Sequence, residues 1–416
     1  MKLTSSTAVG LLFAVAAVPA SSQGYGQSRP AQNVPQPTQT ETPVPEGQGP
    51  VVRASAKAVK ALQELQKAVQ ANDRASIPAK LAQAQAVATT REDRLIIAQL
   101  QLKAAAAAND LPSVSAAADA IAASGLVDSG AVARLYRGVG GSYYNAKQYA
   151  LAAAAYERAV ALNPRDVDAL TMLAESRNGE GRKADAASIF QRSIQASLAA
   201  GQKPKEEVYR RAVALAYDAK APSATELARQ WVAAYPSPDS WRNSIGIYRN
   251  LNRPDAESGL DLMRLLRVTG AMTPADFASY LYALNAQSNF IEAQNALANP
   301  GQVNVSSPEV AEIAGALKAK PKVTAAELSA AARSVATANG LLRIGDRFYG
   351  LGDYAKAVEA YQQAKAKGAD SNLINERVGV ALAAAGDKAG ATAALKSVTG
   401  SRAGVAQLWL LYLQQG

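Results

Sequence analysis

Two stretches near the end of the chain repeat one pattern of small and large residues at a fixed spacing. Gly345 and Gly379 lie 34 residues apart, and each is followed by a Gly-Asp pair, at 352–353 and 386–387. A glycine inside an apolar helical stretch lets a second helix pass close by, and a Gly-Asp pair supplies a tight turn and a helix cap. This region is therefore predicted to fold as helical hairpins that recur every 34 residues.

A third copy of the pattern occupies residues 136–164. Gly140 and Tyr143 take the small and large positions of its first predicted helix, and Ala152 and Tyr156 take those of the second. Pro164 ends the second helix, because proline cannot continue it. Weaker copies fill most of the chain between residues 54 and 400, so about ten hairpins are expected.

The three copies resemble the tetratricopeptide repeat (TPR). The resemblance implies an all-α fold, a right-handed α-solenoid of helix-turn-helix repeats in which each hairpin packs only on its sequence neighbours. It also implies a non-enzymatic scaffold whose first helices line a concave groove for extended or helical peptides. The family's carboxylate-gripping pattern of lysines and asparagines is not reproduced, because Gly141 stands where an asparagine is expected.

The repeats and their flanks divide the chain into seven predicted segments. Trp409 and Tyr412 lie in an apolar final helix and are expected to cap the open end of the array, with a dimer contact as the alternative. The segments are a signal peptide at 1–20, a disordered Pro/Gln-rich linker at 21–50, degenerate N-terminal helical repeats at 51–132, TPR-like repeats at 133–300, a degenerate helical hairpin at 301–337, C-terminal TPR repeats at 338–401 and a C-terminal capping helix at 402–416.

The first twenty residues have the layout of a cleavable secretory signal. Lys2 is followed by an apolar run from Ala8 to Val18, and small residues precede the expected cleavage after Ala20. The apolar run is short for a membrane anchor. We therefore expect a periplasmic protein in the bacterial cell envelope, with no membrane span after cleavage.

The composition removes several classes of function. The chain contains no cysteine and no histidine, so disulfides, the usual structural zinc, thiol catalysis and the commonest general base are excluded. No phosphate-binding loop and no serine-nucleophile motif occurs. We expect no enzyme activity, no cofactor and no metal. The formal net charge is +10, but without a dense basic run we expect no nucleic-acid binding.

The resemblance places a set of polar residues on the concave side of the first helices. Their arginines favour an acidic protein or peptide partner, and the alternative is that they are solvated helix surface. The site residues are Arg134, Arg137, Tyr144, Asn145, Arg242, Arg249 and Asn250, and Asp168, Thr171, Glu175 and Asn178 lie on the same side.

Two other functions are compatible with such an array. A periplasmic component of polysaccharide binding or export machinery would present exposed aromatic residues in the groove, such as Tyr144 and Tyr349. A glycan-cleaving enzyme on the same scaffold would require two carboxylates facing each other across a cleft, within about 10 Å. The other acidic residues are interpreted as helix starts and solvated faces.

Overall fold

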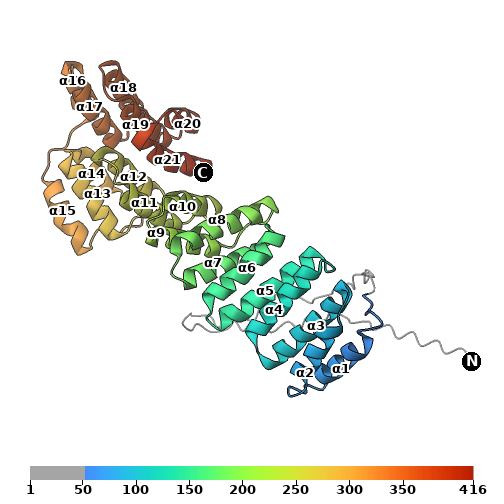
Figure 1. Cartoon of the computed structure of the whole chain (residues 1–416). Helices are drawn as coiled ribbons and strands as arrows, with labels where there is room; N and C mark the ends of the chain where they lie inside the picture. The colour runs from blue at the N-terminus through green and yellow to red at the C-terminus, as the bar shows by residue number, and fades with distance from the viewer. Residues whose placement is uncertain (1–51, 416) are drawn as a thin grey trace, which may run out of the picture. The chain divides into compact units, whose positions relative to one another are not determined.

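The computed structural model describes residues 52–415, and every regular element in this range is a helix. The chain divides into two compact units, unit 1 up to Ser142 and unit 2 from Tyr143, which are described separately (Figure 1). The expected all-α class of helical repeats is confirmed. The predicted signal peptide at 1–20 and the predicted linker at 21–50 lie outside the described residues.

In its described part, residues 52–142, unit 1 contains four helices and most of a fifth. Helices α1, α2 and α3 contact one another, and α3 packs on α4. Helix α3 begins at a capping box, in which Thr90 Oγ1 accepts a hydrogen bond from the backbone N–H of Asp93 and the Asp93 carboxylate accepts one from that of Thr90. The helices are α1 (Val59–Gln70), α2 (Ile77–Val87), α3 (Arg91–Ala108), α4 (Leu111–Ser124) and α5 (Ser129–Asn145), the last of which runs into unit 2.

The first half of unit 2 is a regular array in which each helix packs on the next, from α6 to α11. Its core combines alanines with a few large rings, among them Phe190, Tyr209 and Trp231, all at most 3% exposed. Alanine lets the helices approach closely, and the rings fill the remaining space. The helices are α6 (Tyr149–Leu162), α7 (Val167–Gly179), α8 (Lys183–Ala199), α9 (Glu206–Asp218), α10 (Ser223–Ala234) and α11 (Pro238–Asn252).

The second half of unit 2 is less regular. The segment 301–337, expected to be one hairpin, is split, because α15 packs on α13 and α14 whereas α16 packs on α17. Helices α17 to α20 then pack in sequence. The helices are α12 (Ala256–Val268), α13 (Pro274–Ala286), α14 (Phe290–Ala298), α15 (Pro308–Lys318), α16 (Ala325–Ser334), α17 (Ala338–Leu351), α18 (Tyr354–Ala366), α19 (Ser371–Ala384), α20 (Lys388–Lys396), the 3-10 turn η1 (Gly400–Arg402) and α21 (Ala403–Gln415).

The predicted Gly-Asp turns are confirmed in both C-terminal repeats. Gly352 and Gly386 adopt φ values of 81° and 83°, in the left-handed region that favours glycine. The next residue caps the following helix in each case: Asp353 accepts a hydrogen bond from the backbone N–H of Lys356, and Asp387 from that of Gly390.

The glycines at the repeat spacing lie where two helices meet. A Cβ atom added to Gly345 would lie 2.4 Å from Cε1 of Tyr361, and one added to Gly379 would lie 2.5 Å from Cγ of Leu395. Each glycine is on the first helix of a hairpin and its neighbour is on the second. The predicted close approach within these hairpins is therefore confirmed.

The expectation that hairpins pack only on sequence neighbours is wrong for the second half of unit 2. Helix α14 packs on α17, and α12 packs on both α19 and α21 (Figure 1). Residues 260–266 of α12 are buried on every side, and a helix with no solvated face needs neighbours all round it. We call the contact between these two groups of helices the seam: α14 and α12 form one side of it, and α17, α19 and α21 form the other.

The last helix belongs to the seam. Trp409 is 1% exposed, and its indole Nε1 donates a hydrogen bond to the carbonyl oxygen of Asp261 on α12, at 3.2 Å. Tyr412 packs against the same core, with its ring 6.5 Å from that of Trp241 on α11. In addition to its contact with α20, α21 therefore packs on helices about 150 residues earlier in the chain.

Candidate functional site

A groove of about 660 Å³ runs along unit 2 between α9 and α11. This volume lies within the range of about 300–1,000 Å³ that is usual for ligand sites. Both helices are the first helix of a hairpin, since α9 precedes α10 and α11 precedes α12. The lining residues are Glu207, Arg210, Arg211, Val213, Ala214, Tyr217 and Asp218 on α9, Trp231 on α10, and Arg242, Asn243, Gly246, Ile247 and Asn250 on α11.

The spacing of these residues explains why they share a surface. On α9, Arg210, Ala214 and Tyr217 are separated by four and three positions. On α11, Arg242, Gly246 and Asn250 are each separated by four positions. Residues three or four apart lie on the same face of an α-helix. The two faces meet through a hydrogen bond of 2.9 Å, donated by Nδ2 of Asn250 to the hydroxyl oxygen of Tyr217.

Some of the charges in the groove are neutralised by neighbouring helices. Arg211 forms a two-pronged ion pair with Glu175 on α7, with Nε and Nη2 each 2.9 Å from a carboxylate oxygen. Asp218 accepts a hydrogen bond of 2.8 Å from Nζ of Lys183. These pairs join successive hairpins and leave little net charge at their own positions.

Two arginines keep more of their charge available to a ligand. Arg210 forms no ion pair within residues 52–415 and lies over the ring of Trp231, at 5.9 Å from its centroid. Arg242 donates from Nε to the carbonyl oxygen of Ala271 at 2.8 Å, and its nearest carboxylate, that of Asp239, is 4.0 Å away. The groove therefore presents two guanidinium groups beside an aromatic ring.

Tyr144 extends the polar surface toward the start of unit 2. Burial, together with the nearby negative charge of Glu175, raises the pKa of its hydroxyl above the ordinary value, while Arg211 acts in the opposite direction. Its ring contacts that of Tyr149 edge to face, at 5.4 Å between centroids. Tyr144 thus continues the row of residues formed by Glu175 and Arg211.

Comparison with known families identifies the repeats. A family model described as tetratricopeptide repeat matches residues 140–201 and 342–405. These two regions are tetratricopeptide repeats. No curated protein matches it.

Three solved structures are similar to this one at low sequence identity. A structure described as pilF of Pseudomonas aeruginosa is 17% identical, covering 62% of this chain and 97% of that chain. The TPR2AB domain of yeast Sti1, in a complex with pHSP90, is 15% identical, and the match covers 69% of this chain and 100% of that chain. A tetratricopeptide repeat protein from Parabacteroides merdae is 11% identical, and the match covers 79% of this chain and 100% of that chain. All three have a TM-score of 0.25 and assign no function to this chain.

The structure brings some of the predicted site residues together. Arg242 and Asn250 line the groove, and Tyr144 lies near Arg211 and Glu175. Arg249 does not line it, because its Nη1 turns toward Sδ of Met263 on α12, at 3.7 Å.

The other predicted site residues lie outside the groove lining. Arg134 and Arg137 belong to unit 1, where the first is exposed and the second is half-buried. Asn145 is exposed at the end of α5. Arg210 and Tyr217 were missed because the segment of α9 has no glycine turn that would fix its helical phase.

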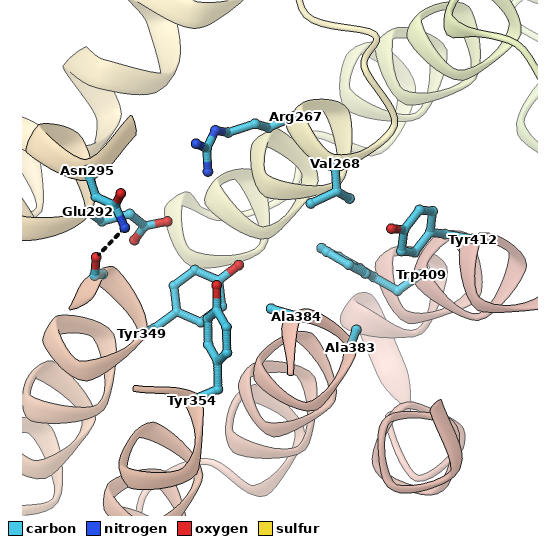
Figure 2. A pocket seen from close by; sticks show the side chains of 11 residues that line it. Arg267, Val268, Glu292, Asn295, Tyr349, Tyr354, Ala383, Ala384, Trp409 and Tyr412 are labelled. Carbon is cyan, nitrogen blue, oxygen red and sulfur yellow. Dashed lines mark hydrogen bonds between the residues drawn. The ribbon is translucent and has the colours of Figure 1, made fainter. Parts of the chain in front are cut away.

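A second, smaller cavity of about 200 Å³ lies at the seam (Figure 2). Figure 2 shows Tyr349 and Tyr354 side by side at one end of the cavity and Trp409 and Tyr412 at the other. On the side of Tyr349, Nδ2 of Asn295 donates a hydrogen bond of 3.0 Å to the carbonyl oxygen of Gly350. The volume of the cavity is below the usual range for ligand sites.

Neither metal ligation nor membrane insertion is indicated by the described part of the chain. Residues 52–415 contain no cluster of three or more side chains that could hold a metal ion. Within the same range, no helix combines the length and apolar character that crossing a bilayer requires.

Proposed function

We propose that this chain is a non-enzymatic scaffold that binds an acidic segment of a protein or peptide partner in the groove between α9 and α11. The repeat fold is that of protein-interaction scaffolds. The acidic preference rests on Arg210 and Arg242, which both line the groove. No carboxylate lies closer than 4.0 Å to Arg242, and Arg210 forms no ion pair within residues 52–415. A guanidinium group recognises carboxylates through paired hydrogen bonds.

The character of the groove supports a peptide over the alternatives named from the sequence. A polysaccharide site would gather exposed aromatic rings, but Tyr349 lies in the seam, with its ring 4.2 Å from the Arg264 guanidinium. A glycan-cleaving site would place two carboxylates across an open cleft. Asp261 and Glu292 are close together, but both are buried and bind Arg264.

We also propose that the chain is exported to the periplasm. The support is the layout of residues 1–20, with Lys2, an apolar run and small residues before Ala20. The intact mass of the chain recovered from an envelope fraction should correspond to a protein that begins at Ser21. A recovered protein that still begins at Met1 would contradict this proposal.

The groove can be tested with Arg210→Ser and Arg242→Ser in one variant. We expect the affinity for an Asp/Glu-rich peptide to fall about tenfold or more, which corresponds to about 1.4 kcal/mol. The salt dependence of binding should also become flatter, because fewer charged contacts remain to be screened. Fluorescence anisotropy with the labelled peptide, at low and high salt, measures both quantities.

The matched control for this experiment replaces Arg333 and Arg347 by serine. Both arginines are exposed outside the groove, and the change in net charge is the same. Each exposed substitution should change the free energy of unfolding by at most about 0.5 kcal/mol. A control that weakens binding as much as the groove variant would indicate a general charge effect, and equal affinities for the Asp/Glu-rich peptide and its Asn/Gln counterpart would refute the acidic preference.

A further inference from the structure

The seam contains a buried cluster of charged side chains contributed by four helices. We call it the seam cluster: Asp261 and Arg264 of α12, Glu292 of α14, Asp346 of α17, and Glu376 and Arg377 of α19. All six residues are at most 4% exposed. Its residues are close in space although α12 and α19 are more than 100 positions apart in the chain.

The arginines bind three of the four carboxyl groups of the seam cluster. Arg264 and Arg377 both donate to Oδ1 of Asp261, at 2.8 and 2.6 Å. Arg264 also donates two hydrogen bonds to Glu292, at 2.7 and 2.5 Å. Nε of Arg377 is 3.5 Å from Oδ1 of Asp346.

Glu376 is held differently. Its Oε2 accepts hydrogen bonds from Oγ of Ser258, at 3.1 Å, and from Nη1 of Arg402, at 3.4 Å. Its Oε1 and Oδ2 of Asp261 are both buried and accept no hydrogen bond, and the neighbouring charge of Asp261 raises the pKa of Glu376. Two neighbouring buried carboxylates repel each other when both are ionised, so a proton on one of the pair is favourable.

The balance of buried charge also favours a proton. The seam cluster has four carboxyl groups and two guanidinium groups. Arg343 and Arg402 approach from its edge, where they also pair with Glu257 and Asp255 respectively. A buried excess of negative charge is unfavourable, and protonation of Glu376 reduces it.

We propose that a proton shared between Glu376 and Asp261 is a latch that closes the seam, so that loss of this proton opens the contact between α19 and α12. Burial, and then the neighbouring charge of Asp261, raise the pKa of Glu376 to about 8. In the open seam, water restores the ordinary pKa near 4.5. The closed seam therefore binds more protons than the open seam between about pH 4.5 and pH 8, and raising the pH across this window favours opening.

The tyrosine hydroxyls and the buried guanidinium groups around the latch lose their protons only above this window. Each neighbouring tyrosine has a hydroxyl whose pKa is raised above the ordinary value of 10. The pKa values of the Arg264 and Arg377 guanidinium groups are also raised. The chain has no histidine and no cysteine, so no side chain has an ordinary pKa between 5 and 8. The charged or titratable residues that face the latch are Tyr248 of α11, Asp255, Glu257, Asp261 and Arg264 of α12, Tyr280 of α13, Glu292 of α14, Arg343, Asp346 and Tyr349 of α17, Tyr361 of α18, Arg377 of α19 and Arg402 of η1.

Energy transfer between two dyes across the seam tests the proposal in the full chain. Ser279→Cys on α13 and Gln362→Cys on α18 introduce the only two thiols, at exposed positions on opposite sides of the seam. In the chain with native Glu376, the equilibrium constant for opening should rise up to tenfold per pH unit between about pH 5 and pH 8 and then level off. The Glu376→Gln variant should stay closed with no such slope, because its amide N–H replaces the shared proton.

Two further measurements make the outcome decisive. Glu359→Gln, at an exposed position on α18, is the matched control and should keep the pH response. The infrared carbonyl band of a protonated carboxylic acid should be present at pH 6 and lost as the pH passes about 8, a result that needs no variant. A seam whose opening does not depend on pH, a slope that persists in Glu376→Gln, or the absence of the band at pH 6 would each overturn the latch.

Discussion

Replacing Arg377 by alanine is expected to lower the free energy of unfolding of unit 2 by about 3–5 kcal/mol, because it removes one partner of a buried ion pair and leaves the other charged. Arg377 is 0% exposed and donates to Asp261 at 2.6 Å. It also forms an ion pair with Glu257. Without the guanidinium group, the carboxylates of Asp261 and Glu257 remain in the seam with less positive charge beside them.

Urea unfolding followed by tryptophan fluorescence measures this loss. All three tryptophans, at 231, 241 and 409, lie in unit 2, so the signal reports on the unit that contains the seam. Arg347→Ala is the matched control, because Arg347 is exposed on α17, and it should change stability by at most about 0.5 kcal/mol. If both variants unfolded at the same urea concentration, the seam cluster would not stabilise the fold.

Replacing Gly345 by leucine is expected to destabilise unit 2 by about 1–3 kcal/mol through overpacking. The added Cβ would lie 2.4 Å from Cε1 of Tyr361. Tyr361 cannot move away easily, since its ring is buried and its hydroxyl donates a hydrogen bond of 2.8 Å to Oδ1 of Asp346. The same urea experiment measures the effect.

The same substitution at Gly315 should not destabilise the protein. Gly315 lies inside α15, and a Cβ there would meet no atom within 4 Å. Leucine is a better helix former than glycine, so Gly315→Leu should be neutral or stabilising by up to about 1 kcal/mol. Equal destabilisation by both substitutions would show that the close approach at Gly345 is not what makes glycine necessary.

The parts of the fold that could be predicted from the sequence are those set by local chemistry. Gly352 and Gly386 permit the left-handed turns, and the aspartates after them cap the next helices. Gly345 and Gly379 mark the close approach of the two helices of a hairpin. Each of these features acts over at most about twenty residues, so the pattern along the chain contains the necessary information.

The seam could not be predicted in the same way. Asp261 and Glu376 look like any charged residues on a helix, and the interpretation of acidic residues as solvated faces was wrong for them. Asp261 binds Arg377 and Glu376 binds Ser258, each more than 100 residues away, and no local pattern encodes that pairing. One signal was present, because Leu260, Leu262 and Met263 place apolar side chains on every side of α12.

Only part of the candidate site could be predicted, because a residue can be assigned to a face only where the helical phase is known. Arg242 and Asn250 were assigned to the groove face of α11, and they line it. Arg249 is one position from Asn250, and one residue corresponds to a rotation of about 100° around a helix, which is enough to point it toward α12. On α9 no turn residue fixed the helical phase, so Arg210 could not be assigned to a face.

The seam also determines when this chain can fold on the ribosome. Asp261 and Arg377 are 116 residues apart, and at about 5–20 residues per second Arg377 is made roughly 6 to 23 s after Asp261. During that time Arg264 is the only guanidinium partner already available to Asp261 within the seam cluster. Hairpins α6 to α11 pack on near neighbours and can form while the chain is still growing, whereas α12 reaches its final surroundings only after the last repeats have been synthesised.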